Sequence, residues 1–147
     1  MFELGTDGPS IIVVGIDGSD SSMRAAAYAA GLARRQRSKL ALVYIQPSGA
    51  ISAPGAGAAV VDLGRDIAED LQRQIVEATE RLDEHERPSW EFISEPGDPY
   101  NGLMKVADRL KADAVVIGAS QKAGHRILGS VAVRLVKAGR WPVTVVP

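Results

Sequence analysis

Short apolar runs alternate along this chain with segments of helical period. The five expected strands are Ile11–Ile16, Leu40–Ile45, the segment around Trp90 and Phe92, Ala114–Ile117 and Pro142–Val146. Strands that alternate with helices form a parallel sheet with right-handed crossovers and helices on both faces. The sequence therefore predicts an α/β fold, a three-layer sandwich built around a five-stranded parallel sheet.

Residues that favour helix ends separate the predicted helices from the strands. Ser19 or Asp20 is expected to cap the first helix, Asp62 the second, and Asp98, which is followed by proline, the third. Each of these side chains can accept a hydrogen bond from an unpaired N–H group of the first turn. Gly139 is expected at the end of the fourth helix, because glycine readily adopts the left-handed conformation found there.

Two stretches are predicted to lie outside the regular elements. Residues 1–10 are expected to form a loose tail, with a single domain over residues 11–147. The Gly/Ala/Pro/Ser-rich stretch Pro47–Ala59 shows no periodicity and is predicted to be a loop, either a lid or a surface insertion. The strand around Trp90 alternates apolar and polar residues, which favours an edge position.

Composition excludes several classes of function. The 17 basic and 18 acidic residues nearly cancel, whereas a nucleic-acid surface normally requires a basic excess. Cysteine is absent, so disulfides and thiolate chemistry are excluded. No His/Asp/Glu group has metal-ligand spacing, and His85 is surrounded by charged residues that favour a solvated position. Without a signal peptide or a long apolar run, the expectation is a soluble cytoplasmic protein with no membrane or nucleic-acid partner.

Ligands of parallel α/β sheets bind at the carboxyl ends of the strands. The loops that follow Asp17, Ile45 and Gly118 are expected to meet there. The carboxylate of Asp17 could accept a hydrogen bond from a ribose hydroxyl or an adenine amino group. It could equally cap its own turn through the N–H groups of Gly18 or Ser19, and the spacing does not separate the two interpretations.

The chain from Asp113 to Pro147 has the layout of a phosphate-binding unit: a strand, a glycine-bearing loop that runs from Gly118 to Ser130, a helix and a second strand. Gly118 is expected to let the backbone turn sharply, and Ser130 to cap the helix and offer its hydroxyl to a phosphate. The loop between them contains Lys122, Gly124, His125 and Arg126, which could contact a polyphosphate or form an ordinary solvated loop. Residues 15–22 faintly resemble the Ser/Gly/Asp loop of adenylating pyrophosphatases but lack the paired glycines that surround pyrophosphate.

Four segments together resemble the universal stress protein family. They are IIVVGIDGSDSSMRAAAYAAGLA (11–33), LALVYIQP (40–47), PGDPYNGLMKVADRLKADAVVIGAS (96–120) and GSVAVRLVKAGRWPVTVVP (129–147). The resemblance implies the adenine nucleotide alpha-hydrolase-like fold with spatial strand order 3-2-1-4-5. It also implies a homodimer that pairs through the Val143–Val146 strand. Members of the family bind ATP, cyclic AMP or no nucleotide, and most have little or no enzymatic turnover.

The resemblance also implies a set of binding residues. Carried over position by position, they are Gly15, Ile16, Asp17, Ile45, Ile117 and Gly118 on the adenosine side and Gly129, Ser130 and Val131 on the phosphate side. Ala132 occupies a place that is often polar in binders. Magnesium is implied only if a polyphosphate is bound.

One part of the family pattern is altered in this chain. ATP-binding members have Gly-x2-Gly-x9-Gly-Ser/Thr, whereas here Gln121 replaces the second glycine. Only the seven residues 122–128 then separate Gln121 from Gly129.

Three hypotheses about function follow. The first is a stress-response regulator that binds ATP or another adenine nucleotide without significant turnover. The second is a dimeric interaction module of the same fold that binds no nucleotide. The third, weighed lowest, is a slow ATPase or adenylate-transfer enzyme.

Overall fold

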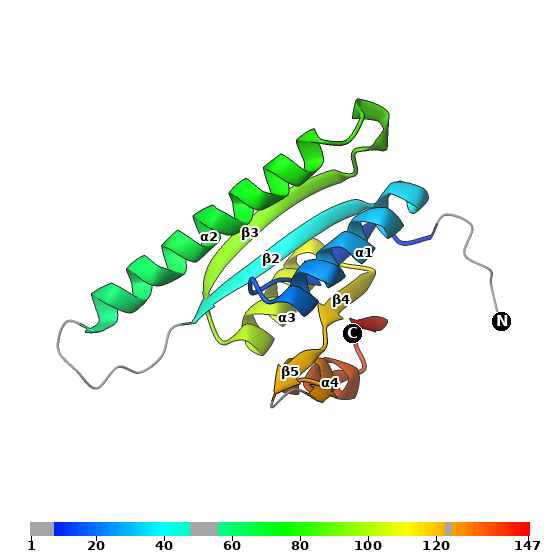
Figure 1. Ribbon diagram of the computed structural model, residues 1–147. Coiled ribbons are helices and arrows are strands. Elements are labelled where there is room, and N and C mark those ends of the chain that lie inside the picture. The colour runs from blue at the N-terminus through cyan, green and yellow to red at the C-terminus, as the bar shows by residue number, and fades with distance from the viewer. Residues whose placement is uncertain (1–7, 48–55, 123–124) are drawn as a thin grey trace.

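The computed structural model describes residues 8–47, 56–122 and 125–147. Its elements, in chain order, are β1 (Ile11–Gly15), α1 (Asp20–Gln36), β2 (Lys39–Pro47), α2 (Ala56–Glu80), the 3-10 helix η1 (Glu84–Glu86), β3 (Ser89–Gly97), α3 (Pro99–Leu110), β4 (Ala114–Gly118), β5 (Ser120–Lys122), β6 (His125–Ile127), α4 (Ser130–Ala138) and β7 (Val143–Val146). Figure 1 shows the strands of the main sheet lying between the helices.

The main sheet confirms the predicted topology. Its strand order is β3-β2-β1-β4-β7, and every pair of neighbours is parallel. Counted without the small β5–β6 sheet, this is the order 3-2-1-4-5. In the central strand, Val13 lies opposite Ala41 on one side and Val115 on the other. β3 and β7 form the two edges, as expected for the strand around Trp90.

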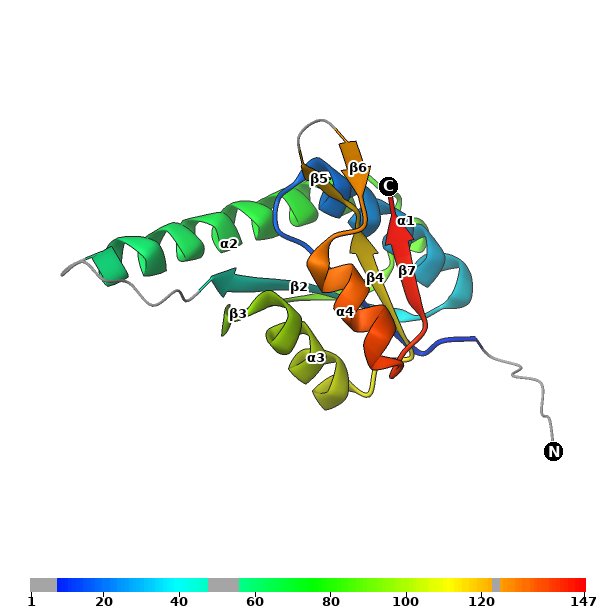
Figure 2. The same ribbon diagram turned by 90° about the horizontal axis from the view of Figure 1, so that it is seen from below.

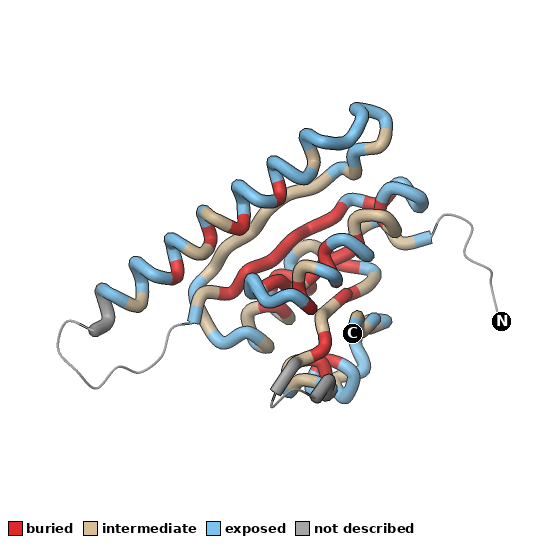
Figure 3. Tube along the Cα trace, viewed as in Figure 1, coloured by how far each residue is buried: buried red, intermediate tan, exposed pale blue. Residues whose placement is uncertain are grey.

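Two apolar clusters hold helices against the two faces of the sheet. One lies beneath α1 and α2 and includes Ile12 and Val14, and the other lies beneath α3 and α4 and includes Val13 and Val115. All four of these strand side chains are fully buried. Burying one such side chain stabilises the fold by about 1.5–3 kcal/mol before ordering costs. Figure 3 shows buried residues along β2 and at the centre of the molecule, whereas α2 is buried along one side only.

Most of the predicted helix ends are confirmed. The Ser19 hydroxyl accepts a hydrogen bond from the Ser22 N–H group at 3.2 Å, so Ser19 and not Asp20 caps α1. The Asp98 carboxylate accepts one from the Asn101 N–H group at 2.9 Å at the start of α3. Gly139 ends α4 in the left-handed conformation, with φ 64°.

The prediction for the start of the second helix was wrong. α2 begins at Ala56, so Asp62 lies inside it, and the final residues of the predicted Pro47–Ala59 loop are helical. Pro47 itself ends β2, and residues 48–55 lie outside the described residues. Alanine has the highest intrinsic helix propensity, and the alanines in this segment extend the helix beyond its amphipathic part. None of the helices in the described residues combines the length and apolar character needed to cross a membrane.

The loop between β4 and α4 contains an antiparallel pair of strands that was not predicted. β5 and β6 pair with Ser120 opposite Ile127, Gln121 opposite Arg126 and Lys122 opposite His125. The pair projects beside β4 and α4 at the carboxyl end of the sheet (Figure 2). Strands of three residues are too short to show a period in the sequence, which is why periodicity could not find them.

Candidate nucleotide site

A cleft of about 730 Å³ opens at the carboxyl ends of β1, β2 and β4. Every residue that the sequence nominated for binding lines this one cleft: Gly15, Ile16, Asp17, Ile45, Ile117, Gly118, Gly129, Ser130 and Val131. They come from strand ends, loops and the start of α4, and lie as far apart in the chain as Gly15 and Val131, yet the parallel sheet brings them together. A cleft of this volume is in the usual size range for a small-molecule ligand.

Asp17 stabilises its own turn. Its Oδ1 atom accepts a hydrogen bond from the Ser19 N–H group at 2.9 Å, and its own N–H group donates to the Ser22 hydroxyl at 3.2 Å. The turn-capping interpretation of Asp17 is therefore confirmed. Because Asp17 also lines the cleft, a ligand that contacts its carboxylate would share it with the hydrogen bonds of this turn.

The turn also changes the acidity of Asp17. Partial burial raises the pKa of this carboxyl, but hydrogen bonds from Ser19 and Ser22 outweigh burial, and the net pKa lies below its usual value. Tyr44, on β2, responds in the opposite direction. The pKa of the Tyr44 phenol is raised, mainly by burial and to a smaller extent by the negative charge of Asp17. Near neutral pH the cleft therefore presents an ionised Asp17 and a neutral Tyr44.

Gly118 has a different role from the predicted one. Its φ angle is not positive, so glycine is not required there for a left-handed turn. Instead, a Cβ atom at this position would clash with the backbone of Ser21 and Ser22 at the start of α1. The missing side chain allows α1 to lie directly against the end of β4, which sets the distance between two walls of the cleft.

The start of α4 faces the cleft without a side-chain cap. Gly129 is the N-cap residue and Ser130 the first helical residue, so the prediction that Ser130 caps the helix was wrong. α1 and α3 begin with a side chain that accepts from their first turn, but α4 does not. The first N–H groups of a helix have no partner within it and carry partial positive charge. Those of Ser130 and Val131 have no other partner among the described residues and can bind an anion.

The altered part of the loop is the β5–β6 pair. The backbone of Gln121 lies in an antiparallel ladder opposite Arg126, where backbone groups pair with each other. Fewer N–H groups are then available to surround a phosphate chain than in an open loop. The contacts predicted for the side chains of Lys122, His125 and Arg126, and the position of Gly124, lie outside the described residues.

The cleft has further lining residues that were not nominated from the sequence. Tyr44, Ile67, Leu103 and Ser120 belong to this group. Tyr44 directly precedes the nominated Ile45 in β2, so its place near the cleft was open to prediction. Ile67 lies within α2, and nothing in the sequence around it marks it as a cleft residue. Ala132 also lines the cleft and is almost fully buried.

Comparison with known proteins assigns the chain to a class. The model of the universal stress protein family matches residues 10–147, so the chain belongs to that family. A universal stress protein of Methanocaldococcus jannaschii is 29% identical over 140 residues, which cover 92% of this chain and 80% of that protein.

Solved structures agree with this fold. Universal stress protein UspA from Lactobacillus plantarum matches with a TM-score of 0.81 and 21% identity, over 94% of this chain and 97% of that one. A universal stress protein in complex with cAMP matches with a TM-score of 0.59 and 26% identity, over 94% and 96% of the two chains.

Proposed function

We propose that this protein is a stress-response regulator that binds an adenine nucleotide in the cleft at the carboxyl ends of β1, β2 and β4. The observation that carries the proposal is the uncapped start of α4, whose free N–H groups face a cleft lined by all nine nominated residues. A helix start of this kind binds phosphate groups. The related universal stress protein in complex with cAMP gives independent support for a nucleotide.

The adenosine moiety would occupy the part of the cleft between β1 and β2. Ile16 and Ile45 provide apolar surface for the base, and both are buried in the walls of the cleft. The Asp17 carboxylate, which lines the cleft, would accept a hydrogen bond from a ribose hydroxyl. Because the pKa of Asp17 is lowered, the carboxylate is ionised near neutral pH and is the stronger acceptor.

The phosphate would lie at the start of α4, in contact with the N–H groups of Ser130 and Val131. Candidate ligands are ATP, ADP, AMP and cyclic AMP, with magnesium only if a polyphosphate is bound. Among the described residues, no three His, Cys, Asp or Glu side chains gather in a way that could hold a metal ion. Metal ions would therefore enter this site with the nucleotide's own phosphates as ligands.

We propose binding without significant turnover. Asp17 is the carboxylate among the nominated residues, and its lowered pKa makes it a weak general base. Its Oδ1 atom is also engaged by Ser19. A ligand would then act by shifting a conformational or partner equilibrium. A sensitive assay for phosphate release tests this part, and release well above background would contradict it.

The homodimer, the cytoplasmic location and the domain limits at residues 11–147 remain predictions. Support for the dimer comes from the position of β7 at the edge of the sheet, where its outer backbone groups can pair with a second strand. Pairing of β7 with β7 of a second copy would continue the sheet across two subunits.

A second candidate function is a protein-interaction module that binds no nucleotide. The observation that favours it is the β5–β6 ladder, which uses backbone groups that a phosphate-binding loop would present. Mass spectrometry of the supernatant after denaturation of freshly purified protein separates the two. Recovery of an adenine nucleotide in near-stoichiometric amount supports the regulator. If none is recovered and none binds on titration, the interaction module is favoured.

A further inference from the structure

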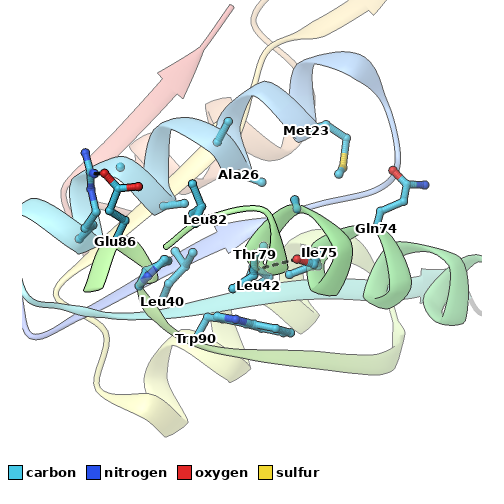
Figure 4. Close-up of a pocket in the computed structure, with 16 residues that line it drawn as sticks. Met23, Ala26, Leu40, Leu42, Gln74, Ile75, Thr79, Leu82, Glu86 and Trp90 are labelled. Carbon is cyan, nitrogen blue, oxygen red and sulfur yellow. Dashed lines mark hydrogen bonds and ion pairs between the residues drawn. The ribbon is translucent and has the colours of Figure 1, made fainter. Parts of the chain in front are cut away.

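A second hollow, separate from the cleft, lies between α1 and α2 over β2 and β3. Its volume is about 410 Å³. We call it the α1–α2 groove, and its main lining side chains are Ala26 and Ala30 from α1, Ile75 and Ala78 from α2, and Leu42 and Trp90 from the strands. Figure 4 shows Trp90 and Leu42 at the base of the groove, with Ala26 and Ile75 on its two sides.

The groove exists because of the residues that α1 presents to it. Ala26, Ala30 and Gly31 carry little or no side chain, so α1 does not fill the space toward α2. α2 instead packs on the sheet through Leu71 and Ile75, which are buried. The groove therefore presents an apolar surface beside water, and a bound apolar molecule would remove that surface from water at a gain in free energy.

Charge is confined to one end of the groove. There the Arg34 guanidinium lies 4.0 Å from the Glu86 carboxylate, with 44% and 42% of the two side chains exposed. At this distance and exposure the pair is weak, because solvent screens the two charges. Figure 4 shows Glu86 at one end of the groove and the uncharged Met23 and Gln74 at the other. A ligand with an anionic end would thus be oriented by Arg34.

We propose that the α1–α2 groove binds a single-chain amphiphile, an unbranched acyl chain that ends in a carboxylate. The chain would lie over Trp90 and Leu42, between the two helices. The carboxylate would replace Glu86 as the partner of Arg34, whose planar guanidinium can donate two parallel hydrogen bonds to a carboxylate. The site is independent of the nucleotide cleft and of the function proposed for it.

Trp90 provides a direct readout. The second tryptophan, Trp141, packs in the cluster beneath α3 and α4 on the opposite face of the sheet, so Trp141→Phe leaves a single reporter at the groove. We expect decanoate, titrated below its micellar concentration, to change Trp90 fluorescence saturably. Decanol, which has the same chain without the charge, is expected to bind more weakly. A lack of saturable response to both ligands in the folded protein would overturn the proposal.

Two charge variants test the orientation. Arg34→Gln is expected to weaken decanoate binding about tenfold, the effect of losing a charged hydrogen-bond partner, and to leave decanol binding unchanged. Glu86→Gln should strengthen decanoate binding, because it removes the competing carboxylate, and should also leave decanol unaffected. If Arg34→Gln weakens both ligands equally, or neither, the assignment of the carboxylate to Arg34 is wrong.

A filling variant tests the location. Ala30 is half-buried, and Ala30→Leu places a larger side chain in the groove. This variant is expected to abolish binding of both ligands with little change in thermal stability. Circular dichroism of the variant is the control for the folded state. Binding that persists in Ala30→Leu would contradict the proposal. So would a change of oligomeric state in this variant, which would identify the groove as an interface between copies.

Discussion

The backbone of Gly118 lies directly against that of Ser21, so that a Cβ atom on Gly118 would come within 2.6 Å of the Ser21 carbonyl carbon and oxygen. This contact joins the end of β4 to the first turn of α1. The same first turn contains Ser22, which holds the Asp17 turn through its hydroxyl group. Contact between Gly118 and Ser21 therefore positions the end of β4 relative to the Asp17 turn, on the adenosine side of the cleft.

Replacing Gly118 with alanine should destabilise the fold. The atoms that block a Cβ are backbone atoms and cannot move away as a side chain can, so we expect a loss of about 3 kcal/mol, the upper end of the range for overpacking. Urea denaturation measures this loss. Gly31→Ala is the matched control: in α1 a Cβ would meet only Arg35 at 3.6 Å, and the change should stabilise the helix by about 0.5–1 kcal/mol. Equal changes in the free energy of unfolding for the two variants would show that the contact with Ser21 does not require glycine at position 118.

Removing the Ser130 N–H group should weaken phosphate binding. Proline is tolerated at the first position of a helix, and Gly129 has an extended conformation (ψ 160°) that can precede proline. We expect Ser130→Pro to lower the affinity for AMP about tenfold or more, and to leave adenosine binding unchanged. Ser130→Ala is the control, because it removes the hydroxyl and retains the N–H group. Isothermal titration of both ligands reads out the effect.

The Asp17 carboxyl should make stability sensitive to acid. Its folded pKa is lowered below the ordinary 3.8, so protons bind more tightly to the unfolded chain. The stability it contributes is therefore present above pH 3.8 and is lost as the pH falls through the lower folded pKa. Asp17→Asn keeps an oxygen for the Ser19 N–H group but cannot titrate, so its free energy of unfolding should fall less steeply in acid than that of the wild type.

Asp70→Asn is the control for this acid effect. Hydrogen bonds from Arg73 and Gln74 lower the pKa of Asp70, but the group lies at the surface, where salt screens its interactions. Its contribution to the acid response should be smaller and should shrink further in high salt. Chemical denaturation at a series of pH values compares the variants, and an acid response unchanged by Asp17→Asn would refute the assignment.

The outer edge of β7 provides a test of the predicted dimer. The carbonyl oxygens of Pro142 and Val146 accept hydrogen bonds from Val115 and Ala119 in the direction of β4. Because backbone groups alternate in direction along a strand, those of Val143 and Val145 point away from β4. Val145→Pro should therefore remove an outward donor and convert a dimer to a monomer while the fold is retained.

Sedimentation analysis measures the oligomeric state of this variant. Val145→Ala serves as control, since it shortens the side chain and keeps the N–H group, and it should remain dimeric. A wild-type protein that is monomeric at all accessible concentrations would contradict the dimer. A dimer that survives Val145→Pro would place the interface elsewhere than on β7.

The fold was predictable because its signals are local and repeated. Apolar strands such as Ile11–Gly15, and side-chain caps such as Ser19 and Asp98, can be recognised from neighbouring residues alone. The strand order could not be derived in this way and came from the resemblance to a family. The convergence of distant loops on one cleft follows from the rule that ligands bind at the carboxyl ends of parallel strands.

The predictions that were wrong or missing depend on contacts distant in sequence. The need for glycine at position 118 comes from α1, almost a hundred residues earlier, and no local pattern reveals such a contact. The β5 and β6 strands have three residues each, too few to show a periodic pattern in the sequence, so they were predicted as part of an irregular loop. The α1–α2 groove likewise depends on the separation of two helices, which the alanines of α1 permit but do not specify.

Isothermal titration of the purified protein with adenosine, AMP, cyclic AMP and ATP is the most direct test of nucleotide binding in the cleft. At least one adenine nucleotide should bind with a stoichiometry of one per chain, and more tightly than adenosine, since the start of α4 adds phosphate contacts. Ser130→Pro should remove this advantage. No detectable binding of any of these ligands to folded protein free of bound nucleotide would contradict nucleotide binding in the cleft.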